Sequence, residues 1–238
     1  MQPQLKLGTA LVFGGTGTVG SAVVRNLSSR GIPVVFTYCA SEEKARALEA
    51  ETSQRALHLD LRNPDAIEPF LRDLTEDIGI FIHCAATSRA ATLEDISNDE
   101  WQAVQTVNAT SAFVATRGLA PRMVARGGGR IVFVGALAPN QAAAVPVHFA
   151  ATQGMLSSMT MALAKELGGK NVLVNMLALG LLEGGLSREI SPKLVADYKT
   201  FSALRRLGNA QEAARVIAWL ALENSYINGE VVTVNGGV

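Results

Sequence analysis

A glycine-rich segment near the start of the chain, at residues 13–20, has the composition of a phosphate-binding loop. It follows an apolar run at residues 10–13 and opens a segment with helical periodicity. Glycine permits positive φ and lets the backbone approach a pyrophosphate, whose charge the N–H groups at a helix start can receive. The residues expected to line such a loop are Gly14, Thr16, Gly17, Val19 and Gly20.

Few other side chains could carry out chemistry. His58 and His83 lie at the ends of predicted strands, and we interpret both as structural. His148 is a candidate acid, although a histidine at a helix start or an interface is the simpler interpretation. Cys84 has no base beside it in the sequence and is interpreted as a small buried residue. No spacing of His, Cys, Asp and Glu indicates a metal site.

Short apolar runs alternate with longer helical patterns, and these elements must position the loop. Strands are predicted at residues 10–13, 33–38, 56–59, 78–84, 130–134, 172–177 and 231–234. Helices are predicted at residues 19–29, after Ser41, and at 65–74, 101–126 and 148–167. This alternation predicts one Rossmann-type α/β domain over residues 1–238, with a doubly wound, mostly parallel sheet covered by helices on both faces. Ligands bind such a sheet where the strand order reverses.

The composition restricts the possible partners. Of 238 residues, 48% are hydrophobic, and the 21 Lys and Arg balance the 21 Asp and Glu. The chain therefore has material for a large core, and it has no charge excess that favours nucleic acid or an anionic membrane. Cys39 and Cys84 form no CxxC pair, so the reduced cytoplasm is the expected location. The expected partner is a small molecule or another protein.

Several further motifs form a recognisable set. Residues 58–61 read His-Leu-Asp-Leu, residues 83–86 read His-Cys-Ala-Ala, and Asn108 lies between Val and Ala. The ending, from Arg-Leu-Gly at 206 to Val-Asn-Gly-Gly at 234–237, completes the set. Together these motifs resemble the short-chain dehydrogenase/reductase family, most closely its branch of 3-oxoacyl reductases acting on acyl carrier protein or CoA thioesters. The resemblance covers essentially the whole chain.

The resemblance implies a nicotinamide dinucleotide as cofactor. It places Asp60 and Leu61 near the adenine, Ala85 in the turn after the fourth predicted strand, and Asn108 in the active site. No acidic residue ends the second predicted strand, where a carboxylate would hold the ribose of NAD, so the sequence favours NADP(H) over NAD(H). No Arg lies in the loop to meet a 2′-phosphate, and loss of dinucleotide binding stays open as an alternative.

The catalytic positions of the family hold other residues in this chain. The family takes the proton for ketone reduction from a Tyr, assisted by a Lys four residues later, a Ser and an Asn. Matching the motifs puts Ala136 at the Ser, Phe149 at the Tyr and Gln153 at the Lys, so that Asn108 alone is retained. None of the three tyrosines is followed four residues later by a lysine, and a shifted alignment does not restore the motif.

The nicotinamide end departs from the family as well. Leu179 stands in place of a Pro, and Gly184 stands in place of a Thr that binds the carboxamide or the phosphates. A positioned acid contributes roughly 10²–10⁴-fold to a rate, so the isolated chain is expected to be catalytically impaired.

The leading hypothesis is a non-catalytic subunit, a pseudoenzyme, that partners an active ketoreductase or dehydrogenase of the same family. The resemblance implies homo- or hetero-oligomers, dimers or tetramers, formed through the two long helices and the C-terminal strand region, with an acyl-thioester or other small substrate. The first alternative is an active NADP(H)-dependent, 3-oxoacyl reductase-like enzyme with a non-standard proton source. The second alternative is a dinucleotide-sensing regulator.

Overall fold

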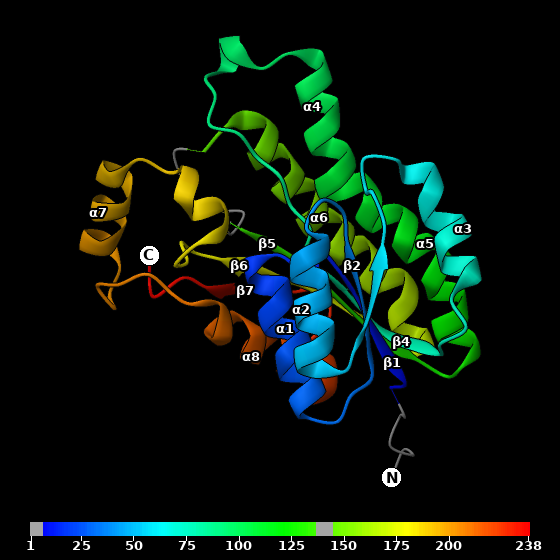
Figure 1. The fold of residues 1–238 in the computed structure, drawn as a ribbon. Coiled ribbons are helices and arrows are strands. Elements are labelled where there is room, and N and C mark those ends of the chain that lie inside the picture. The colour runs from blue at the N-terminus through cyan, green and yellow to red at the C-terminus, as the bar shows by residue number, and fades with distance from the viewer. Residues whose placement is uncertain (1–6, 137–144) are drawn as a thin grey trace.

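Seven parallel strands form one central sheet in the computed structural model, which describes residues 7–136 and 145–238 (Figure 1). The strand order is β3-β2-β1-β4-β5-β6-β7, and every neighbouring pair is parallel. The strands are β1 (Thr9–Phe13), β2 (Val34–Tyr38), β3 (Arg55–His58), β4 (Ile78–His83), β5 (Gly129–Ala136), β6 (Val172–Leu179) and β7 (Val231–Val234). The predicted single-domain, doubly wound α/β fold is confirmed.

Helices cover both faces of the sheet (Figure 1). The α-helices are α1 (Thr18–Ser29), α2 (Glu42–Thr52), α3 (Ile67–Asp73), α4 (Asn98–Gln105), α5 (Ser111–Ala125), α6 (Val147–Leu167), α7 (Pro192–Phe201) and α8 (Ala210–Leu222). Buried side chains of α1, α2 and α8 form one core with the sheet, and those of α3, α5 and α6 form the other. Because both faces are covered, the middle strands are mostly apolar, and β4 is buried at every residue.

The order in which successive strands are added to the sheet reverses beside β1. From β1 it runs outward to β2 and β3, and it then returns to place β4 on the other side of β1. The carboxyl ends of β1 and β4 therefore flank the switch point at which ligands bind in such sheets. The glycine-rich segment follows β1 directly, as the sequence predicts.

The predicted helix at residues 101–126 is wrong in one respect, because it is interrupted. It consists of α4, a π-helical turn at Thr106–Thr110 and α5. The Asn108 side chain within that turn is bonded to the backbone of Thr87, a contact with a distant segment that helical periodicity does not reveal. π-Helical turns of this kind occur frequently at functional sites.

Two helices were missed at the sequence level. The side chain of Ser191 accepts a hydrogen bond from the Leu194 N–H at the start of α7, and Pro192 occupies the first helical position. Asn209 and Glu212 form a capping box at the start of α8. Both signals are visible in the sequence.

In the part of the chain that the structure describes, no helix combines the length and the apolarity needed to cross a bilayer.

Candidate active site

The loop after β1 is held by close backbone packing. The Gly14 N–H donates to Thr37 Oγ1 at 3.2 Å, and the Gly15 N–H donates to the Thr37 carbonyl at 2.8 Å. Gly14 has φ +74°, and a side chain there would meet the backbone of Ala85 at 2.8 Å. A Cβ on Gly20 would lie 2.1 Å from the Gly14 oxygen. The two glycines are therefore required by the packing of the turn itself.

The outer side of this loop has room for a ligand. Gly17 is the N-cap of α1 and makes no side-chain capping bond, so no side chain occupies the start of the helix. A Cβ on Gly17 would meet only the Gly14 oxygen, at 3.2 Å. Thr16 and Val19 are half-buried on either side. An uncapped helix start beside a close-packed glycine turn fits the pyrophosphate of a dinucleotide.

The residues expected near an adenine lie around the same strand ends. Leu61 is buried, and Ala85 lies against Gly14 in the turn after β4. Asp60 follows β3, and both its oxygens are bound by the Arg62 guanidinium at 2.7–3.1 Å. The hydrogen bonds from Arg62 lower the pKa of Asp60 to about 2, so this carboxylate is ionised and held in place.

Asn108 connects three segments beside the switch point. Its Oδ1 accepts from the Thr87 N–H at 2.8 Å, and its Nδ2 donates to the Thr87 carbonyl at 2.9 Å. Nδ2 also lies 3.3 Å from Thr152 Oγ1 on α6. The side chain is 1% exposed, so it joins the loop after β4 to α6 from a buried position.

Ala136, Phe149 and Gln153 are brought to the same place. The Ala136 N–H donates to Gln153 Oε1 at 2.8 Å, and Gln153 Nε2 donates to Thr152 Oγ1 at 3.0 Å. Thr152 Oγ1 in turn donates to the Phe149 carbonyl at 2.7 Å. The sequence analysis missed Thr152, which links Asn108 to Gln153; its place beside Gln153 was the only available signal. The four catalytic assignments made from the family pattern stay predictions.

His83 and His148 are buried, and Cys84, expected to be buried, is half-buried, so none of these three offers an exposed acid. His148 is 0% exposed, with Nε2 3.4 Å from Glu100 Oε1, which the Arg89 guanidinium also contacts. Desolvation lowers the pKa of the buried His83 to about 4, and burial raises the pKa of the Cys84 thiol to about 12. His58 is exposed, and its ring lies edge-on to Tyr38.

The segment after β6 forms the remaining side of the site. Leu179 is buried at the strand end, and Gly184 has φ +90° just before the short helix Gly185–Glu189. A Cβ on Gly185 would meet Thr18 Oγ1 at 3.2 Å, so this segment approaches the start of α1. The structure thus brings the glycine loop, the Asn108 network and the segment after β6 together at the carboxyl ends of the strands.

Comparison with known proteins agrees with this arrangement. The family described as Enoyl-(Acyl carrier protein) reductase matches residues 15–238. The 3-oxoacyl-acyl-carrier-protein reductase FabG of Aquifex aeolicus is 31% identical over 248 residues, covering 100% of both chains. The acetoacetyl-CoA reductase of Allochromatium vinosum is 30% identical over 239 residues, covering 96% of this chain and 97% of the relative.

Solved structures agree as well. A short-chain dehydrogenase/reductase of Serratia marcescens superposes with a TM-score of 0.89 at 26% identity, covering 98% of each chain. A 3-oxoacyl-acyl-carrier-protein reductase of Brucella melitensis with bound NAD superposes with a TM-score of 0.86 at 26% identity, covering 99% of this chain and 94% of the other.

These relatives contradict the leading hypothesis of a non-catalytic subunit, which is wrong. The full-length relatives from Aquifex aeolicus and Allochromatium vinosum are named as reductases, and nothing in the comparisons indicates a pseudoenzyme or a hetero-oligomeric partner. The physical reason is that a missing acid lowers a rate without removing the binding and orientation that also promote reaction. Sequence and structure agree that the chain belongs to the short-chain dehydrogenase/reductase family.

Proposed function

We propose that the chain is an active NADP(H)-dependent oxidoreductase that reduces the ketone of a 3-oxoacyl thioester to the alcohol. The observation that carries this proposal is the glycine loop at residues 14–20, which we call the cradle. In it, Gly14 and Gly20 are closely packed and the start of α1 is uncapped at Gly17. The names of the full-length relatives, reductases of 3-oxoacyl-acyl-carrier-protein and of acetoacetyl-CoA, support the substrate class.

The chain's own residues bind and orient in this reaction. When bound, NADPH supplies the hydride to the carbonyl carbon. The cradle and the Asp60 edge hold the adenosine half, while Asn108, Thr152 and Gln153 form a rigid wall near the end of β5 and the start of α6. The oxygen then needs one proton to become the hydroxyl.

We propose that this proton comes from water. Thr152 Oγ1 is 0% exposed, accepts two hydrogen bonds and donates its proton to the Phe149 carbonyl, so it has none to give. Phe149, at the position that the resemblance assigns to the acid, cannot donate at all. Water as the donor predicts a kcat lower by roughly 10²–10⁴-fold than in a relative with a positioned acid.

The test is turnover by the purified chain with NADPH and acetoacetyl-CoA, followed as loss of the reduced nicotinamide. The matched control is Gly17→Trp, because Gly17 is exposed and a Cβ there would meet only the Gly14 oxygen, at 3.2 Å, so a large side chain would cover the outer side of the cradle. We expect slow turnover in the wild type and none in the control at an unchanged melting temperature. Equal background rates in both proteins would overturn the proposal, and dinucleotide binding without turnover would favour the sensing regulator.

We further infer that the chain is a cytoplasmic homo-oligomer. The outer surfaces of α5 and α6 carry large apolar side chains with about half their area exposed, namely Phe113, Met155 and Met161. Contact with a second copy would bury them. Light scattering should show a dimer or tetramer that Phe113→Asp and Met155→Asp dissociate; a monomeric wild type would contradict the inference.

A further inference from the structure

A small cavity lies beside the phosphate loop, between α1 and α2. Its volume is about 180 Å³. Thr16 lines it from the loop, and the remaining lining residues come from the two helices: Ser21, Arg25, Lys44, Ala47 and Leu48. The cavity therefore shares Thr16 with the cradle and extends from it toward α2 (α1 and α2 lie side by side in Figure 1).

Lys44 is the positively charged residue at one end of a row of α2 side chains, here called the α2 stripe, that faces α1. Lys44, Ala47 and Leu48 recur at the three- and four-residue spacing of one helical face, and Glu51 continues that face one turn later. At the far end, both oxygens of Glu51 are bound by the Arg25 guanidinium at 2.7 and 2.8 Å. The Arg25 charge is thereby neutralised, whereas Lys44 stands at the end of the stripe nearest the loop.

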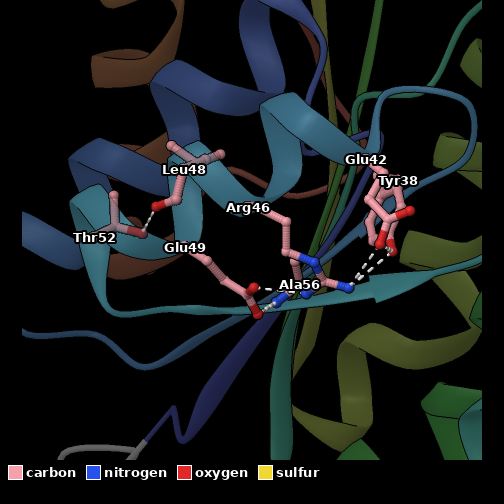
Figure 2. Close-up of polar contacts among 7 residues, drawn as sticks. All are labelled: Tyr38, Glu42, Arg46, Leu48, Glu49, Thr52 and Ala56. Carbon is pink, nitrogen blue, oxygen red and sulfur yellow. Dashed lines mark hydrogen bonds and ion pairs between the residues drawn. The ribbon is translucent and has the colours of Figure 1, made fainter.

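Two other acidic groups of α2, Glu42 and Glu49, are also occupied. Figure 2 shows Arg46 reaching from α2 to Glu49 on one side and to Glu42 and Tyr38 on the other. Glu49 additionally accepts from the Ala56 N–H at 2.7 Å. Among the described residues, none forms an ion pair or hydrogen bond with the Lys44 ammonium. The remaining charge of this turn is Glu43, which is exposed and points about 100° away from Lys44 around the helix.

The carboxylate beside the end of β2 is Glu42, 3.4 Å from the Tyr38 hydroxyl, and Arg46 pairs with it at 3.3 Å. β2 ends at Tyr38 with no carboxylate, and the Tyr38 hydroxyl is already bonded to Arg46. The described contacts of Thr16 leave its hydroxyl free to donate, while the Ser21 hydroxyl donates to the Thr18 carbonyl. An ammonium and a free hydroxyl beside an open cavity are the donors that a phosphate dianion requires.

We propose that Lys44, together with the Thr16 hydroxyl, binds the 2′-phosphate of NADP(H), and that Lys44 determines the preference for NADP(H) over NAD(H). This inference rests on the proposed function, because it requires the dinucleotide to occupy the cradle. The 2′-phosphate then enters the cavity between α1 and α2, and α2 supplies the charge that no Arg of the loop supplies.

The test is calorimetric titration of the whole protein with NADPH, NADH and 2′,5′-ADP. The variant Lys44→Gln removes the charge and keeps a helix-forming residue. The matched control is Lys165→Gln, which removes the same charge from α6 on the opposite face of the sheet. For Lys44→Gln we expect affinity for NADPH and 2′,5′-ADP to fall about tenfold, the loss typical of one charge-assisted hydrogen bond at an accessible site, with NADH unchanged. Thr16→Val should produce a smaller loss of the same kind.

The outcomes separate this inference from the function on which it rests. If the wild type binds both dinucleotides and Lys44→Gln weakens neither, or weakens both equally, the assignment of Lys44 is overturned and the proposed function stands. If the folded wild type binds NADPH, NADH and 2′,5′-ADP no better than buffer, the proposed function and the assignment of Lys44 both fail.

Discussion

The cradle after β1 is formed by backbone atoms, whereas the wall beside β5 and α6 is formed by side chains. The cradle consists of backbone: Gly14 and Gly20 approach each other so closely that a single Cβ would collide. The wall consists of side chains, namely Asn108, Thr152 and Gln153, joined by hydrogen bonds. A backbone-built site cannot lose its glycines without losing the turn. A side-chain-built site can exchange its residues while the surrounding packing stays in place.

Gln153 illustrates this difference. Its amide has one acceptor and two donors, and in this chain the acceptor satisfies the Ala136 N–H while a donor reaches Thr152. A lysine in its place could donate but not accept. Gln153 therefore supports the end of β5 in a way that a lysine could not.

The largest expected effect is a gain of activity. The triple variant Ala136→Ser, Phe149→Tyr and Gln153→Lys introduces the residues that the family resemblance implies, and we expect kcat with acetoacetyl-CoA to rise by roughly 10²-fold because a positioned acid replaces water. Steady-state kinetics with NADPH checks it. Phe149→Leu with the other two positions unchanged is the control, and a triple variant no faster than that control would show that the alignment of these positions is wrong.

The next effect concerns the backbone side of the comparison. Gly20→Ala places a Cβ 2.1 Å from the Gly14 oxygen, so we expect the free energy of unfolding to fall by about 3 kcal/mol and dinucleotide binding to be lost. Urea denaturation measures the first change and calorimetry the second. A Cβ on Gly169 meets nothing within 4 Å, so Gly169→Ala should leave both quantities unchanged. Normal binding by Gly20→Ala would show that the turn is not close-packed.

A smaller effect tests the side-chain wall. Gln153→Leu keeps the approximate size of the side chain but removes the acceptor of the Ala136 N–H, and we expect a loss of about 2 kcal/mol in the free energy of unfolding. Gln105→Leu is the matched control, since Gln105 is a buried glutamine whose Nε2 has no hydrogen-bond partner among the described residues. Equal losses in the two variants would mean that the bond to Ala136 adds nothing to stability.

The smallest effect is a dependence of stability on pH at the adenosine edge. The pKa of Asp60 is lowered from 3.8 to about 2 by Arg62, so the ion pair stabilises the fold above pH 3.8 and this contribution is lost as the pH falls toward 2. Arg62→Met should flatten the urea midpoint over that interval. The change is small because Arg62 is 70% exposed and screened by solvent. An identical pH profile in wild type and variant would contradict it.

Local patterns were sufficient for most of the fold. The apolar runs of the seven strands, the glycine spacing at 14, 17 and 20, and the strand–helix alternation indicated a parallel sheet with a glycine-rich loop at its switch point, and the structure has both. The capping signals at Ser191 and Asn209 were present but not used. These features are predictable because propensity, capping and hydrophobic periodicity depend on neighbours within a few residues.

Contacts between distant segments were decided only by the tertiary structure. The π-helical turn at Asn108 depends on the backbone of Thr87, the role of Gln153 depends on Ala136, and the uncompensated charge of Lys44 depends on Arg25 and Arg46 occupying the nearby carboxylates. The sequence by itself determined the architecture, the location of the cradle and the family. Only the folded chain decided which side chains bond to one another, because hydrogen bonds and ion pairs act over a few ångströms and join residues that lie in different segments of the sequence.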